Sequence, residues 1–170
     1  MEAGCPDSAD NEPEQPEQPT QPTCKDGLAR VYMPTMHTID AANPRSRIET
    51  TDIDLTKSAK KTTMQTMTFK LPSEAVGKDC LVNWGMPAER DFTVVDGGVV
   101  DVIETTDGLS EKVGAANFEN WPETEGPKDM NVVGSTECKE QLDFLLSLRN
   151  EGSVFMAQNE ETGWFVQYKC

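Results

Sequence analysis

The length, composition and charge of the chain set the first limits on its function. Its 170 residues suffice for one domain with a hydrophobic core, and its formal net charge is −15. Such acidity excludes nucleic acid and anionic membrane surfaces as expected partners, because both require clustered Lys and Arg. No stretch approaches the roughly 20 apolar residues of a membrane helix, so no transmembrane segment is expected.

The first 26 residues are predicted to form a disordered acidic tail. They contain five prolines among Glu, Gln, Asp and Thr, and no aromatic or branched aliphatic residue. Such a segment cannot bury enough apolar surface to offset the entropy of ordering. We therefore expect a tail at 1–26 and one folded domain at 27–170.

After the tail, short segments of strand character follow one another and are broken by Gly, Pro, Asn and Asp. In 62–71, Met67, Phe69 and Leu71 share one face, which is the period of two of a half-buried strand. Residues 80–86 alternate in the same way and place Cys80 and Trp84 toward a core. The predicted strands are 28–33, 62–71, 80–86, 92–95, 99–104, 130–133, 141–150, 153–158 and 164–169.

The segment 141–150 is ambiguous between strand and helix. Leu142, Phe144, Leu146 and Leu148 alternate strictly, whereas Leu145 beside Leu146 also permits a helical turn. A helix would scatter the four alternating residues around its axis, so we predict a strand.

Many short strands and few helical windows predict an all-β domain, an antiparallel β-sandwich stapled by disulfides. Two segments are interpreted as loops, 33–43 and 108–127, and each carries large side chains in a polar setting. Loops on a rigid frame commonly carry binding residues. The candidate binding residues are Met36, His37, Phe118 and Trp121. The two aromatic residues either tuck under the sheet, which is the preferred interpretation, or face a partner.

The five cysteines, at positions 5, 24, 80, 138 and 170, are widely spaced and include no Cys-x-x-Cys pair. With one histidine in the chain, a zinc site is not expected, and the spacing indicates long-range disulfides in an oxidising compartment. Cys5 is the odd cysteine and is expected to be a free or loosely paired thiol. The alternative is lipidation, because Ala3-Gly4-Cys5 looks like the end of a bacterial lipobox.

The run Phe69-Lys70-Leu71-Pro72, followed by Val76-Gly77-Lys78-Asp79-Cys80, resembles the opening of the But2 carboxy-terminal domain of fungi. Asp96-Gly97-Gly98 is similar to a later Gly-rich turn of that family, and Cys138 before 142–148 is similar to its second cysteine. The resemblance spans about residues 32–170. It implies a fungal secreted or wall-associated β-sandwich without a known catalytic site. It also implies a core bridge between Cys80 and Cys138, and a bridge between Cys24 and Cys170.

Catalytic chemistry finds little support in the sequence. The only histidine, His37, lies in no serine or cysteine hydrolase motif. Asp52 and Asp54 could share a strand face and help to bind a cation, but no calcium loop surrounds them, and a solvated face is the simpler interpretation. We therefore expect no catalytic residue, no metal and no cofactor.

The sequence predicts a monomeric, non-enzymatic secreted interaction protein of the extracellular space or cell wall. It would act like a fungal effector in virulence and bind a wall or host protein or glycan through loops at one end of the sandwich. A sharper version is an inhibitor of a host protease. The alternatives are a carboxylate-dependent polysaccharide hydrolase and a lipid-tethered bacterial envelope protein.

Overall fold

The computed structural model describes residues 22–87, 91–120 and 130–170. The predicted tail at 1–26 lies outside these residues except for its last five. The described chain is an all-β, antiparallel sandwich, as the sequence predicts, and its helical content is confined to single 3₁₀ turns such as Ser73–Ala75 and Thr106–Gly108.

The smaller sheet has four antiparallel strands. Its central strands form a continuous register, in which Trp84 lies opposite Trp164 and Val82 opposite Val166. The order across the sheet is β1 (Leu28–Tyr32), β13 (Gly163–Lys169), β6 (Asp79–Gly85) and β10 (Asn131–Glu137).

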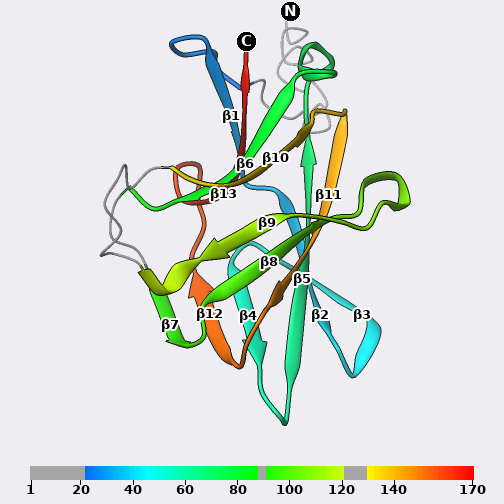
Figure 1. The fold of residues 1–170 in the computed structure, drawn as a ribbon, viewed down its shortest axis with the longest axis vertical. Helices are drawn as coiled ribbons and strands as arrows, with labels where there is room; N and C mark the ends of the chain where they lie inside the picture. Colours follow the sequence, from blue (N-terminus) through cyan, green and yellow to red (C-terminus); the bar gives the residue numbers. More distant parts are fainter. Residues whose placement is uncertain (1–21, 88–90, 121–129) are drawn as a thin grey trace, which may run out of the picture.

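The larger sheet has nine strands and is also antiparallel. Its main path runs β7 (Phe92–Asp96), β12 (Gly152–Met156), β4 (Ile53–Lys57), β5 (Thr62–Lys70), β11 (Gln141–Leu148), β8 (Val99–Glu104) and β9 (Glu111–Asn117). Off this path, β2 (Thr35–Asp40) pairs with β5, and β3 (Asn43–Thr50) pairs with β2. The β2–β3 and β4–β5 turns lie at the bottom of Figure 1, and the C-terminus lies at the top.

Strand β5 is paired along both edges. On one edge Thr62 and Thr63 pair with β4 and residues 65–70 pair with β11, whereas on the other edge Thr63 to Thr68 pair with β2. Gln65 is fully buried where β4 diverges from β5. Its Oε1 accepts a hydrogen bond from the backbone N–H of Asp54 (3.0 Å), and its Nε2 donates to the hydroxyl of Thr38 (3.2 Å). One amide side chain therefore links β5 to both β4 and β2.

The core lies between the two sheets and is built from alternate residues of their strands. Leu142, Phe144, Leu146 and Leu148 of β11 are all buried, which confirms the strand predicted there. An aromatic cluster fills one end of the core: the ring of Phe118 lies 4.5 Å from that of Trp84 and 5.8 Å from that of Trp164.

Strands β9 and β10 bring one edge of each sheet into backbone contact. A Cβ atom on Gly114 of β9 would lie 2.1 Å from the carbonyl oxygen of Val133, and one on Gly134 of β10 would lie 2.2 Å from that of Val113. Real Cβ atoms do not approach backbone so closely, so glycine is required at both positions. The two glycines close this side of the sandwich.

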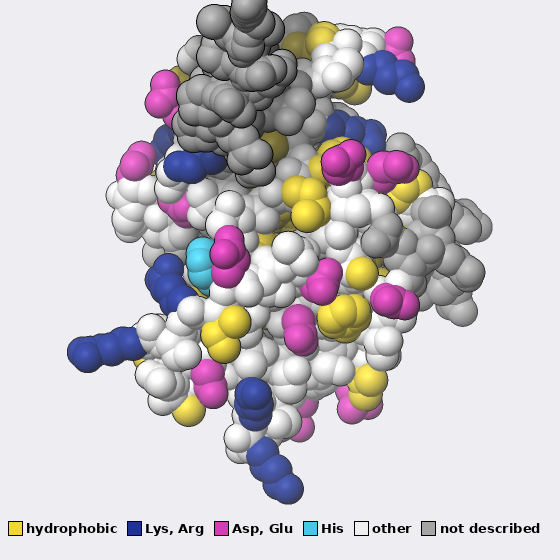
Figure 2. Space-filling view, turned by 180° about the vertical axis from the view of Figure 1, so that it is seen from behind, with side chains coloured by type: hydrophobic (Ala, Val, Ile, Leu, Met, Phe, Trp, Pro, Cys, Tyr) yellow, Lys and Arg dark blue, Asp and Glu magenta, His cyan; other side chains and the backbone are white. Residues whose placement is uncertain are grey.

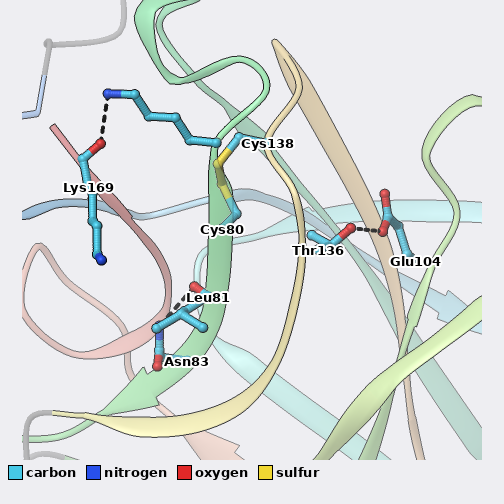
Figure 3. Close-up of a disulfide and its surroundings, with 8 residues drawn as sticks. Cys80, Leu81, Asn83, Glu104, Thr136, Cys138 and Lys169 are labelled. Carbon is cyan, nitrogen blue, oxygen red and sulfur yellow. Dashed lines mark hydrogen bonds between the residues drawn. A yellow bond between two sulfur atoms is a disulfide. The ribbon is translucent and has the colours of Figure 1, made fainter.

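Two disulfides join segments that are distant in sequence, and both bridges implied by the resemblance are present. Cys80 bonds to Cys138, with both residues fully buried, and Figure 3 shows this bridge at the start of β6. Cys24 bonds to Cys170 and joins the segment before β1 to the end of β13. Near the buried bridge, the Thr136 hydroxyl donates to the carboxylate of Glu104 and links the two sheets (Figure 3).

Both segments predicted as loops contain strands. Residues 33–43 contain β2, because Thr35 to Asp40 pair with β5 on one side and β3 on the other. Residues 108–127 contain β9, which pairs with β8, and a 3₁₀ turn at Phe118–Asn120. Neither β3 nor β4 was among the predicted strands.

Candidate functional site

The structure corrects the role predicted for Met36. Its side chain is fully buried, because it lies on the face of β2 that points into the core. Its sulfur accepts a hydrogen bond from Nε2 of Gln158 (3.0 Å), and Gln158 Oε1 accepts one from the backbone N–H of Trp164 (2.8 Å). Met36 is therefore a core residue, and its assignment to a binding surface is wrong.

Phe118 is also fully buried. Its ring packs against Trp84, Trp164 and Phe92, so it takes the tucked position that was the preferred interpretation for this aromatic residue. A side chain at the centre of the core cannot contact a partner, and the predicted binding role of Phe118 is wrong. Trp121 lies outside the described residues.

His37 lies on the outer face of β2 and is half-buried. Its cross-strand neighbours are Glu49 of β3 and Thr66 of β5. Figure 2 shows the single histidine (cyan) at the surface on this side of the molecule. Of the residues predicted to bind, His37 is thus the one that the structure describes at the surface.

The acidic pair Asp52 and Asp54 lies at the start of β4. Asp52 Oδ1 accepts a hydrogen bond from the backbone N–H of Gln158 (3.3 Å), which gives this carboxylate a structural role. Burial and the nearby Asp52 raise the pKa of Asp54, and Lys61 opposes this rise. In the described part of the chain, no three His, Cys, Asp or Glu side chains gather into a metal-binding group.

The strongest charge feature is a set of five basic side chains, which we call the basic end. Strand β3 contributes Arg45 and Arg47, just after the β2–β3 turn, and the β4–β5 hairpin contributes Lys57, Lys60 and Lys61. The two turns are adjacent, because the backbone N–H of Ala41 donates to the carbonyl of Thr62 (2.9 Å). Basic side chains project from the lower left and bottom of Figure 2, where these turns lie.

The basic end differs sharply in charge from the rest of the protein. Residues 41–48 and 55–62 contain five of the 15 basic residues and none of the 30 acidic ones. Within the described residues, no ion pair involves Arg45, Arg47, Lys60 or Lys61. By contrast, two basic side chains elsewhere form ion pairs: Arg149 (2.7 Å) and Lys112 (3.1 Å) both contact the carboxylate of Asp101.

The sequence contains a signal for the basic end that the predictions did not use. The runs 43–48 and 57–61 are both basic, and only the 8 residues 49–56 lie between them. What the sequence does not show is that the two runs meet in space. Their contact depends on the pairing of β2 with β5, and β2 was predicted as a loop.

No helix among the described residues has the length and apolar character needed to cross a membrane. No protein-family model, curated protein or solved structure matches the chain. The resemblance to the But2 carboxy-terminal domain therefore stays a prediction, and no known protein supplies an activity or a partner.

Proposed function

We propose that this protein is a secreted, non-enzymatic binding protein, and that it engages an extracellular protein or glycan of a cell wall or host through the basic end. The function is that of an interaction module, in which a stapled sandwich holds two exposed hairpin turns in a fixed relation. The proposal keeps the predicted class of function and moves the contact surface from the predicted loops to these turns.

The observation that carries the proposal is the local reversal of charge. A chain with a net charge of −15 places five basic residues at the ends of two adjacent hairpins, and the acidic residue that borders these turns, Asp40, accepts a hydrogen bond from the backbone N–H of Ala42 (2.9 Å). Charge that serves solubility is spread over a surface with both signs interspersed. A compact patch of the opposite sign steers a complementary partner and fixes its orientation.

The frame supports the same function. Two disulfides tie the strands, and Lys57 Nζ donates to the carbonyl of Arg149 (3.2 Å), which holds the β4–β5 hairpin against the end of β11. A preorganised surface loses little conformational entropy when it binds. The β2–β3 turn is likewise held, because β2 is paired along both edges.

The test compares three forms of the full chain as baits in extracellular fluid from the source organism and from a host. The first is the wild type, the second carries Arg45→Glu and Arg47→Glu, and the third carries Lys25→Glu and Lys169→Glu. The third form undergoes the same change in net charge near the opposite end, where Cys24 bonds to Cys170. Wild type and the Lys25/Lys169 form are expected to capture the same partner, and the Arg45/Arg47 form is expected to lose it.

Equal capture by all three baits would contradict the proposal. So would turnover of a polysaccharide or protein substrate that disappears in Asp52→Asn or Asp54→Asn, since that result would favour the hydrolase alternative. Circular dichroism of the three baits should give the same spectrum. That control separates a lost contact from a lost fold.

A further inference from the structure

Strand β3 has one edge without a hydrogen-bonding partner among the described residues. It pairs with β2 alone, and no backbone hydrogen bond joins 43–50 to any other described segment. Six of its eight residues are exposed. An unpaired edge presents a row of N–H and C=O groups that another extended chain can bond.

The side chains along this edge define what could pair with it. Arg45 and Arg47 stand two positions apart and are exposed, with Arg45 in a bulge, because Arg47 lies opposite Ile39 and Asn43 lies opposite Asp40. The two arginines favour acidic residues two positions apart in a neighbouring strand. Ile48, at 65% exposure the most exposed large apolar side chain in the described part, follows directly. A matching partner strand would therefore place an acidic residue opposite Arg45, any residue opposite Ser46, an acidic residue opposite Arg47 and an apolar residue opposite Ile48.

A second copy of the chain fits the part of this edge that carries Arg45 and Arg47 poorly. A register centred on Ile48 would instead place Arg47 opposite Glu49, and it is tested by sedimentation below. Antiparallel self-pairing centred on residue 45, 46 or 47 places arginine opposite arginine, and like charges directly opposite are destabilising. Pro44 also lacks the N–H that a longer ladder requires. Charged side chains and proline on an edge strand oppose pairing with a second copy of the same strand.

A glycan also fits less well than a peptide. Residues 35–62 contain no Phe, Tyr or Trp, so neither turn offers one of these rings for a sugar to stack on. The backbone groups of an edge strand, in contrast, match the spacing of another peptide chain. The observations therefore favour a protein partner over a polysaccharide.

We propose that an extended acidic segment of a partner protein binds as an additional strand along β3, with two acidic residues, two positions apart, against Arg45 and Arg47. This inference rests on the proposed function and names its partner class. Main-chain hydrogen bonds supply the geometry of the complex, the arginines select the acidic sequence, and Ile48 takes an apolar side chain on the opposite face.

The experiment selects peptides from a random ten-residue library displayed on messenger RNA, with immobilised full-length protein as the target. Counter-selection uses the variant that carries Arg45→Glu and Arg47→Glu. The enriched peptides are expected to share the acid-x-acid spacing and to lose at least about tenfold in affinity for that variant. Their binding to the Lys25→Glu/Lys169→Glu variant should not change.

Two measurements on the best peptide separate strand pairing from simple charge attraction. Methylation of alternate backbone nitrogens removes donors without changing charge, and one of the two methylation patterns should abolish binding. Hydrogen exchange should slow at 43–50 and remain unchanged elsewhere. Binding that survives both methylation patterns, protection at another strand, or a selection that enriches no acidic peptide would overturn the inference.

The outcomes also distinguish this inference from the proposed function. If capture of a native partner requires Arg45 and Arg47 but the partner is a glycan, strand pairing fails and the proposed function stands. If neither native capture nor peptide binding depends on the two arginines, both fail. A dimer in sedimentation that dissociates on Arg47→Glu would replace the acidic segment with a second copy.

Discussion

Phe118 shows how a single aromatic residue can be essential to the fold without touching a partner. Its ring contacts three aromatic side chains of the core, so truncation leaves a cavity. Phe118→Ala is expected to lower the free energy of unfolding by about 3–5 kcal/mol, measured by urea denaturation. His37→Ala, at a half-buried surface position, should change it by less than about 0.5 kcal/mol. Unchanged stability in Phe118→Ala would contradict the assignment of this residue to the core.

Asp101 links stability to pH. Its hydrogen bonds to Arg149, opposed in part by burial and reinforced by Lys112, lower the pKa of this carboxyl below 3.8. Because the folded-state pKa lies below the unfolded one, the stabilisation is complete above the unfolded pKa and is lost as the pH falls through the folded value. Asp101→Asn should therefore destabilise the protein by about 0.5–1 kcal/mol near neutral pH and have little effect in strong acid. Thermal melting of both forms across this range provides the test, and a difference that persists in strong acid would contradict it.

At the scale of the element, the crossing of β9 and β10 depends on two glycines. An added methyl group at Gly134 meets the carbonyl oxygen of Val113, which is backbone and cannot swing aside. Gly134→Ala is expected to cost about 3 kcal/mol, read from denaturant unfolding. Gly108→Ala is the control, because its φ of +82° brings backbone strain but no atom lies within 4 Å of the new methyl group, and it should cost about 1 kcal/mol. Equal costs for the two variants would mean that the strands can separate without penalty.

The elements that the sequence predicts well are those with a complete alternating pattern. Strand β11 carries four alternating apolar residues, and β8 begins and ends where it was predicted. Two of the missed strands lack such a pattern for different reasons. Strand β3 is an edge, with arginines and a proline and little to bury, and β9 contains Gly114 and small alanines that permit close approach. Their strand conformation depends on pairing with neighbours, which local sequence does not display.

At the scale of the whole molecule, the candidate site could be predicted only in part. The net charge predicts no polyanionic partner for the chain as a whole, yet it conceals a patch of opposite sign. Two runs of basic residues are visible in the sequence, but their meeting requires the register that places Asp40 opposite Thr63. Met36 and Phe118 were misassigned because a large side chain in a polar segment looks exposed until its strand or turn is known.

The two disulfides differ in their access to solvent, and this difference sets their order of reduction. Cys24 and Cys170 are both exposed, whereas Cys80 and Cys138 are fully buried between the sheets. A thiolate must reach a sulfur atom to break the bond, so the buried bridge can react only when the sandwich opens. The exposed bridge should be the one that a mild reductant breaks while the protein stays folded.

The expected result is a stepwise loss of stability. In the chain-entropy model, bridges with sequence separations of 146 and 58 residues contribute about 5 and about 4 kcal/mol. Mild dithiothreitol should therefore lower the melting temperature while unfolding remains cooperative, and alkylation with peptide mapping should find Cys24 and Cys170 labelled and Cys80 and Cys138 protected. A Cys24→Ser/Cys170→Ser variant should melt at the temperature of this partly reduced form and should take up no label at Cys80 or Cys138. Labelling of all four cysteines at the same rate would mean that the sandwich opens as a unit before either bridge is reduced. The exposed bridge would then not be reduced independently of unfolding.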